Sequence, residues 1–247
     1  MKRYCLYLFI LIGISCSAEL KAQKNGTIYK GNDPAVRYTG RTLVSPDGSV
    51  AFDWVGTYLE TRFTGGKLSV KVSETGTSYY NVFVDGKLHK VVKVCGTDTL
   101  IHLVSGIDKR IHSLKIQKRS EGEFGKTTVH QFVLSGSGRL AEEPAVRTRH
   151  IEFIGNSLTC GYGTDGKHRD EPFLVETENC NLTFASMVAR YYDADYTLIA
   201  HSGRGAARNY GDSVRVSKVT MKDRMLNTFD EDLTHKWNFK EYRPDLV

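Results

Sequence analysis

Residues 150–163 decide the fold of the second half of this chain, and they read HIEFIGNSLTCGYG. Residues 150–154 form a short, mostly apolar run that ends at Gly155, which is typical of a buried β-strand. Ser157 follows on the next turn. Turns at the carboxyl ends of parallel strands face the ligand sites of open α/β sheets, so Ser157 is a candidate nucleophile. The alternative is a serine that only caps the turn. The stretch is not a GxSxG elbow, because Thr159 stands where the second glycine would be.

The residues after 163 continue the β-α-β order of a parallel sheet. A helix is predicted from Leu182 to Tyr191 with Asn181 as its cap. Residues 196–200 predict a second strand, and Leu246-Val247 begins a third. We therefore expect an α/β domain over 146–247 that is incomplete at its C-terminus. The predicted apolar face of the helix consists of Phe184, Ala185, Val188 and Tyr191.

Upstream, residues 39–140 alternate apolar and polar positions in short runs, with turn residues about every ten positions. Asp85-Gly86 supplies the positive backbone angles of a tight hairpin. Separate strands are expected at 100–104 and 114–117, among others. The pattern predicts a jelly-roll-like β-sandwich over residues 24–145, and the end of this range, from the glycine-rich residues 135–138 to residues 141–144, is expected to be a linker.

The first 22 residues are typical of a secretory signal peptide. Lys2 and Arg3 precede an apolar run over residues 4–14, which is too short to span a membrane. Cleavage is expected after Ala22, with export to the periplasm, the cell surface or the medium. The alternative is a lipoprotein acylated at Cys16.

The composition excludes several classes of protein. The chain has 247 residues, 40% hydrophobic and 25% charged, with a net charge of +6. These values exclude collagen, disordered and multispan membrane classes, and the dispersed basic residues argue against a nucleic-acid partner. Past the signal, Cys160 and Cys180 either form a disulfide or remain free, and Cys95 is left over. No Cys/His cluster suggests a metal site.

Gly203 lies after the second predicted strand, at the same sheet edge as Ser157. A residue without a side chain can present its N–H to a developing oxyanion, although a helix-entry turn is the alternative reading. Arg204, Arg208 and Asn209 are candidates for binding sugar hydroxyls, with surface ion pairs or turn capping as the alternative. Trp54 and Tyr79-Tyr80 could stack on sugars, but aromatic residues on strands usually belong to the core.

Two blocks resemble the SGNH (GDSL-type) hydrolases in the form found in carbohydrate esterase family 2. Residues 151–163 are similar to the nucleophile block, and residues 201–205 with 208–211 are similar to the second block. Residues 58–65 and 81–86 resemble the β-sandwich domain that precedes the hydrolase domain in that family. Asn156 stands where many SGNH enzymes have aspartate, a change that keeps an acceptor of similar shape.

The resemblance implies a secreted esterase that removes acetyl groups from polysaccharides such as xylan or glucomannan, without a metal or organic cofactor. Ser157 would be the nucleophile, and its N–H and that of Gly203 would stabilise the oxyanion. The family's oxyanion asparagine and histidine base would lie beyond Val247, so the chain as given is expected to be inactive. His201 is the histidine nearest to Gly203 by topology, but the matching position of the family is not the base, so the wall of the cleft or a packed strand end is its expected place. The alternative function is a non-catalytic carbohydrate-binding surface protein with an inert hydrolase-like half.

Overall fold

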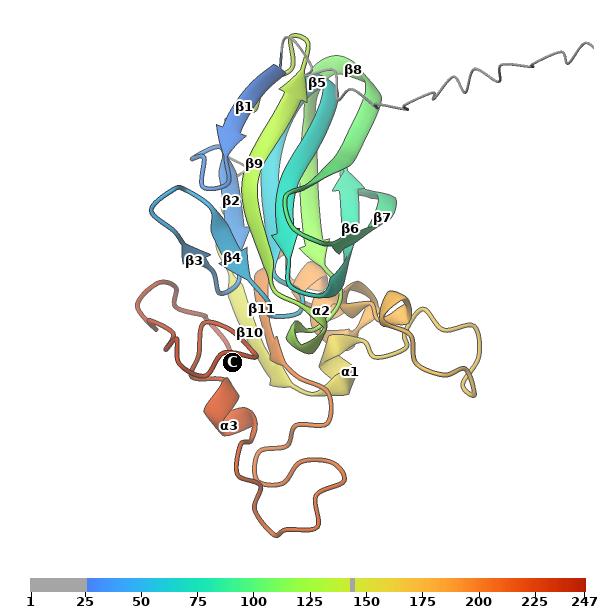
Figure 1. Cartoon of the computed structure of the whole chain (residues 1–247), viewed down its shortest axis with the longest axis vertical. Coiled ribbons are helices and arrows are strands. Elements are labelled where there is room, and N and C mark those ends of the chain that lie inside the picture. The colour runs from blue at the N-terminus through green and yellow to red at the C-terminus, as the bar shows by residue number, and fades with distance from the viewer. Residues whose placement is uncertain (1–25, 143–144) are drawn as a thin grey trace, which may run out of the picture.

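The computed structural model describes residues 26–142 and 145–247, so the expected signal peptide and Cys16 lie outside the described residues. Antiparallel strands fill the first part of the chain, and a smaller part with short helices follows (Figure 1). The strands of the first part are β1 Gly26–Lys30, β2 Val36–Thr39, β3 Leu43–Val44, β4 Val50–Phe52, β5 Tyr58–Glu74, β6 Thr77–Val84, β7 Lys87–Cys95, β8 Thr99–Lys118 and β9 Thr127–Ser135.

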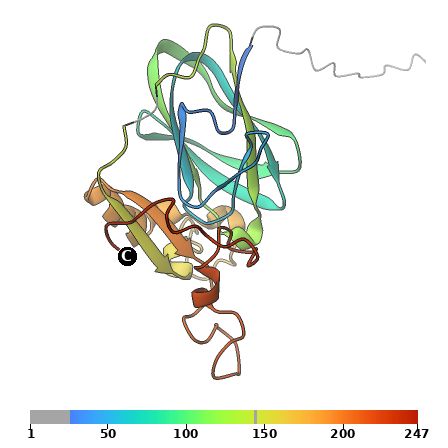
Figure 2. The ribbon, with the colours of Figure 1, turned by 90° about the vertical axis from the view of Figure 1, so that its left-hand side faces the viewer.

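Two long strands, β5 and β8, form the frame of the first part. They pair along nearly their whole length, with register shifts around Gly66. The first half of β5 also pairs with β2, and its second half pairs with β9. Each long strand therefore contributes to both layers, and the sheet folds over itself into a sandwich (Figures 1 and 2). The antiparallel strands expected from the alternation are confirmed.

The space between the layers is filled by side chains from both. Leu68, Leu103, Phe132 and Leu134 are completely buried there. Excluding this apolar surface from water is the main driving force for folding. The sandwich therefore has a hydrophobic core of its own.

The predicted turn at Asp85-Gly86 is confirmed, since both residues have positive φ and join β6 to β7. The prediction of separate strands at 100–104 and 114–117 is wrong, because both belong to β8. Gly106, with φ +70°, lies between them. The sequence pattern breaks there, but the strand bends and continues.

The second part is built on two parallel strands, β10 His150–Gly155 and β11 Asp195–Ala200. Leu246 forms a parallel bridge to Ile151, so the predicted third strand begins beside β10. All six residues of β11 are buried, as expected for a parallel strand covered on both faces. The helices and 3₁₀ turns are η1 Gly122–Phe124, which lies between β8 and β9, α1 Ser157–Cys160, η2 Val175–Thr177, η3 Cys180–Leu182, α2 Phe184–Tyr191 and α3 Met221–Arg224.

The helix predicted over 182–191 is present as α2, but two details of the prediction are wrong. Its cap residue is Thr183, because Asn181 lies in the preceding 3₁₀ turn. Its buried side is made of Ala185, Ser186 and Ala189, whereas Phe184, Val188 and Tyr191 are exposed. Small residues allow the helix to lie close to β11, and the large apolar residues turn outward.

The two parts share buried side chains. Val55 and Tyr58 of the sandwich pack in one cluster with Tyr196 and Leu198 of β11. On the other face of β11, Trp54 packs against Ile199 and Met221. Trp54 is fully buried, and Tyr80 belongs to the sandwich core, so neither forms a sugar platform.

Candidate active site

The two parallel strands end side by side. Gly155, the last residue of β10, pairs with Ala200, the last residue of β11, and the N–H of His201 donates to the carbonyl of Gly155 at 3.4 Å. The chain segments that leave these two ends carry Ser157 and Gly203. The structure thus places both predicted residues at one sheet edge, as the strand–turn pattern indicates.

Ser157 is the first residue of α1. The side chain of Asn156 accepts a hydrogen bond from the N–H of Leu158 and caps this short helix. Gly155 must lack a side chain, because a Cβ there would lie 2.0 Å from Oγ1 of Thr159. The hydroxyl of Ser157 is half-buried and makes no hydrogen bond to another described residue. It is therefore open to a ligand.

Gly203 has φ +73°, which is the left-handed region that favours glycine. A Cβ at this position would find open space, with Cβ of Tyr210 its nearest neighbour at 3.8 Å. Backbone conformation, rather than crowding, therefore explains the glycine. Among the described residues, the N–H groups of Ser157 and Gly203 donate no hydrogen bond.

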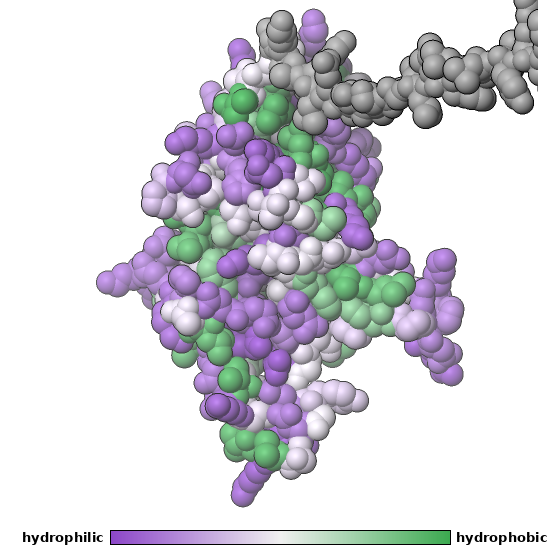
Figure 3. Space-filling model, in the orientation of Figure 1, coloured by the Kyte–Doolittle hydropathy of each residue, from purple (hydrophilic) through white to green (hydrophobic). Residues whose placement is uncertain are grey.

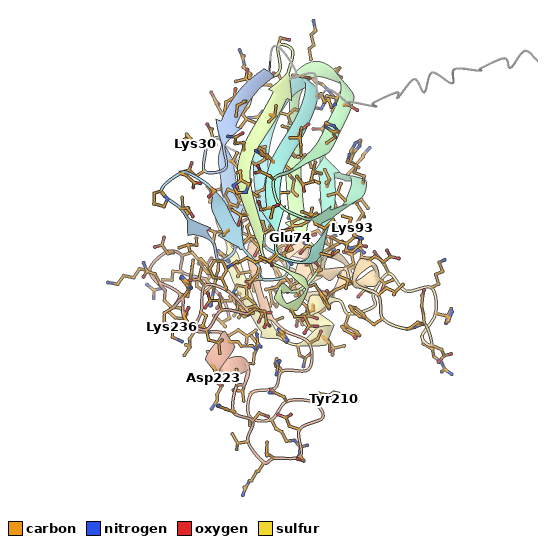
Figure 4. All side chains as sticks on the ribbon, viewed as in Figure 1. Lys30, Glu74, Lys93, Tyr210, Asp223 and Lys236 are labelled. Atoms are coloured by element: carbon orange, nitrogen blue, oxygen red, sulfur yellow. The ribbon has the colours of Figure 1, made fainter. Side chains whose placement is uncertain are left out.

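An open cleft of about 630 Å³ lies over this edge. Asn156, Ser157 and Gly203 form its floor, and Glu123 reaches it from η1 of the sandwich. Tyr210, labelled in Figure 4, stands on the loop that projects farthest from the sandwich. The remaining lining residues are Tyr162, Ser202, Arg204, Gly205 and Arg208.

The two predicted substrate-binding residues have different positions. Arg204 lines the cleft. Asn209 does not: its side-chain amide donates to the carbonyl of Val219 at 2.8 Å and accepts from the N–H of Gly205 at 3.3 Å. Asn209 is buried, and its polar atoms bond to the backbone of its own loop.

His201 is buried behind the cleft. Its Nδ1 lies 2.7 Å from Asp230, and its Nε2 lies 3.4 Å from Glu123. Burial lowers its pKa, but the hydrogen bonds to the two carboxylates outweigh burial and raise the pKa to about 9. His201 is consequently a protonated, paired imidazolium at neutral pH. It lacks the free nitrogen that a general base requires.

Two groups of side chains have the composition of a metal site. In the group of His201, Asp230 and Glu231, the guanidinium of Arg224 donates to both carboxylates and supplies the positive charge. In the group of Glu121, Cys160 and Glu178, the carboxylates accept N–H bonds from the protein backbone. Protein donors thus already occupy part of both ligand sets, which do not fit a resident cation.

Cys160 and Cys180 are free, buried thiols. The thiol of Cys160 donates to Glu121, and that of Cys180 donates to the carbonyl of Lys118. The disulfide alternative is therefore not what the structure shows. Burial is the main reason why the pKa of Cys180 is raised to about 12, so it is an unreactive neutral thiol.

A second, larger cleft of about 800 Å³ lies on another side of the molecule, between β2, β3 and residues 236–245. It is lined mainly by polar and charged residues, and neither Ser157 nor Gly203 reaches it. Size alone therefore does not identify the site. The face shown in Figure 3 is mostly hydrophilic, with hydrophobic residues in separate areas. In the described part of the chain, no helix is both long and apolar enough to cross a membrane.

Sequence reasoning missed the contribution of the sandwich to this site. Glu123 lines the cleft, and Glu121 accepts the N–H of Ser202 at 2.6 Å. Both precede β9 in the chain, about 80 residues before Gly203. The only local signal for this contribution is the polar sequence KRSE over residues 118–121, at the end of an alternating strand. A polar sequence in that position ordinarily predicts a surface turn.

Comparisons with known proteins agree with this architecture. Residues 38–144 match the family model described as carbohydrate esterase 2 N-terminal. The chain is 32% identical over 216 residues to the cellulase/esterase CelE of Acetivibrio thermocellus. This match covers 87% of this chain and 26% of CelE. It is 31% identical over 215 residues to an acetylxylan esterase/glucomannan deacetylase of Cellvibrio japonicus, covering 84% of this chain and 58% of that enzyme.

Among solved structures, a family two carbohydrate esterase from Clostridium thermocellum, in complex with cellohexaose, is similar with a TM-score of 0.80 and 32% identity. The match covers 85% of this chain and 64% of that chain. This chain therefore spans less than two thirds of each relative, and it matches them in both its sandwich and its second part.

Proposed function

Because this chain belongs to carbohydrate esterase family 2, we propose that it is the sandwich and the first catalytic segment of a secreted serine esterase that deacetylates plant cell-wall polysaccharides. The observation that carries the proposal is the pairing of β10 with β11, which brings Ser157 and Gly203 to one open cleft. We further propose that residues 24–145 are the sandwich domain and residues 146–247 are part of an SGNH hydrolase domain.

In this reaction the hydroxyl oxygen of Ser157 attacks the acetyl carbonyl carbon and loses its proton to a base. The N–H groups of Ser157 and Gly203 donate to the oxyanion of the tetrahedral intermediate. The C–O bond to the sugar then breaks, and the sugar oxygen takes the proton. Water hydrolyses the acetyl-enzyme and releases acetate. No step calls for a cofactor.

The base is the part of the proposal that rests on the family resemblance. His201 is unsuitable, since both of its ring nitrogens face carboxylates and its pKa is raised to about 9, by hydrogen bonds that outweigh its burial. We propose that the base is a histidine, and a further oxyanion donor an asparagine, that follow Val247 in the natural protein. On this proposal, residues 1–247 alone turn over substrate very slowly.

Exposed polar groups of the cleft support a carbohydrate substrate. Arg204 and Arg208 offer guanidinium donors, and Tyr162 and Tyr210 expose aromatic rings, which suit sugar hydroxyls and sugar faces respectively. Relatives named as acetylxylan esterases and glucomannan deacetylases support xylan and glucomannan as the substrate class. They do not favour the non-catalytic alternative.

The test is acetate release from acetylated xylan and 4-nitrophenyl acetate by the natural full-length protein, compared with its Ser157→Ala variant. Removing the nucleophile is expected to lower kcat by at least about 10³-fold. Ser137→Ala, in the exposed turn after β9, is the matched control and should keep the wild-type rate. A folded wild-type protein without esterase activity, or an active Ser157→Ala variant, would contradict the proposal.

A further inference from the structure

We propose that Glu121 of the sandwich is a positioning residue of the esterase site, whose single carboxylate oxygen ties the segment carrying Ser157 to the segment carrying Gly203. This inference rests on the proposed function and deepens it. It assigns the sandwich a role in the geometry of the reaction, in addition to any role in stability.

The bonding of one oxygen atom carries the inference. Oε2 of Glu121 accepts the N–H of Ser202 at 2.6 Å, and Ser202 directly precedes Gly203. The same oxygen accepts the thiol of Cys160 at 3.3 Å. Cys160 is the last residue of α1, the four-residue helix that begins with Ser157. Glu121 thereby fixes the distance between the nucleophile and one proposed oxyanion donor.

Glu121 is itself rigidly held. Its residue surface is 0% exposed. Its N–H donates to Oε2 of Glu178 at 3.0 Å, and Nζ of Lys118 donates to its carbonyl at 3.1 Å. The adjoining Lys118 backbone accepts the N–H of Gly56 at 2.9 Å. The carboxylate therefore occupies a position set by the end of β8, and the two catalytic segments are adjusted to it.

A carboxyl group suits this task because one of its oxygens can accept two hydrogen bonds at once, at the reach that a glutamate side chain provides. The neighbouring Glu178 limits the cost of burial. Burial and the charge of Glu121 raise the pKa of Glu178 to about 9, so Glu178 is protonated at neutral pH. Burial lowers the pKa of the adjoining Lys118, whose Nζ donates to the carbonyls of Ser120 and Glu121.

Three substitutions at position 121 separate positioning from charge. Glu121→Gln keeps the length of the side chain and one acceptor oxygen, which can still bind both donors. Glu121→Asp keeps the charge but withdraws the acceptor by about 1.5 Å, and Glu121→Ala removes it. A displacement of this size in a catalytic site typically costs up to about 100-fold in rate. In the natural full-length protein we expect kcat to fall roughly 10- to 100-fold for Asp and Ala and less than about 3-fold for Gln, with KM unchanged within about 3-fold.

Tyr58→Phe is the matched control at the same domain interface. The Tyr58 hydroxyl donates to Asp195 at 2.6 Å, and this side chain does not line the cleft. The variant should lower the melting temperature and leave kcat unchanged. If Glu121 only stabilised the fold, the folded fraction of every position-121 variant would keep wild-type kcat, as this control does. If the charge of Glu121 were decisive, Glu121→Asp would keep the activity and Glu121→Gln would lose it. Either pattern would overturn the proposal.

A second readout is independent of esterase activity. Hydrogen exchange at the amides of residues 201–205, measured by mass spectrometry, should accelerate by at least about 10-fold in Glu121→Asp, because the N–H of Ser202 loses a buried acceptor. Exchange in Glu121→Gln and Tyr58→Phe should remain close to wild type. Unchanged exchange in Glu121→Asp would overturn the proposal even if the wild-type protein proved to have no esterase activity. If the wild-type protein had no esterase activity but exchange in Glu121→Asp were accelerated, only the proposed function would be overturned.

Discussion

The two parts of this molecule are stabilised in different ways. The sandwich encloses an apolar core made of its own residues, with Leu103 and Phe132 among those fully buried. The second part has clusters that include side chains of the sandwich, namely Val55 and Tyr58 on one face of β11 and Trp54 on the other. Sandwich carboxylates also reach its loops. The comparison teaches that the second part, and with it the cleft, takes its shape from the sandwich surface.

The largest expected effect comes from removing the anchor between the parts. Trp54 is fully buried against Ile199 and Met221, so Trp54→Ala leaves a large cavity and should cost about 3–5 kcal/mol of unfolding free energy. Calorimetry and hydrogen exchange measure the outcome. Exchange should rise strongly over residues 195–201 and little over residues 68–72 in the sandwich core.

Phe132→Ala is the control for that experiment, because Phe132 is equally buried but lies only in the sandwich core. It should cost a similar free energy and raise exchange in both parts together, since the second part depends on the sandwich. Two results would contradict the comparison. One is faster exchange in the second part alone for Phe132→Ala. The other is an equal rise of exchange in both parts for Trp54→Ala.

A smaller effect concerns the charged contact of His201 with Asp230 and Glu123. The pKa of this imidazole is raised from 6.5 to about 9, because its hydrogen bonds to the carboxylates outweigh burial. The folded state therefore holds a proton that the unfolded state releases at lower pH. The resulting stabilisation is complete below about pH 6.5, is lost as the pH rises through 9, and is on the order of 3 kcal/mol.

The measurement is the free energy of unfolding from pH 6 to pH 9.5 for the wild type and for His201→Gln. The difference between the two isolates His201 from other titrating groups, such as Glu178. We expect this difference to shrink as the pH rises. A difference that stays constant or grows with pH would show that His201 is neutral in the folded protein and available as a base.

The sequence predicts the two parts unequally well, for a physical reason. Alternation and the Asp85-Gly86 turn identify most sandwich strands because these signals are local. The glycine-ended strands likewise predict that Ser157 and Gly203 meet at one edge. Ala185 was placed correctly on the buried face of α2, but Phe184, Val188 and Tyr191 were not, because close packing on β11 selects small residues. The predicted cap, Asn181, lies in the preceding 3₁₀ turn instead. The role of Glu121 was missed, since its partners are fixed only when the two parts dock.

The smallest effect compares two glycines, one in each part. Gly86 and Gly203 have φ +75° and +73°, and no atom lies closer than 3.8 Å to a Cβ built at either position. Alanine should therefore cost about 1–2 kcal/mol of stability at both, because only the left-handed backbone is penalised. Gly86→Ala, in the β6–β7 turn, should keep wild-type kcat. Gly203→Ala should lower kcat by roughly 10- to 100-fold, because relaxation of the strained backbone redirects an oxyanion N–H. The measurements are the melting temperature and kcat of both variants. Equal loss of stability with unequal loss of kcat would assign a catalytic role to the loop after β11. Wild-type kcat in a folded Gly203→Ala variant would show that Gly203 is not part of the site.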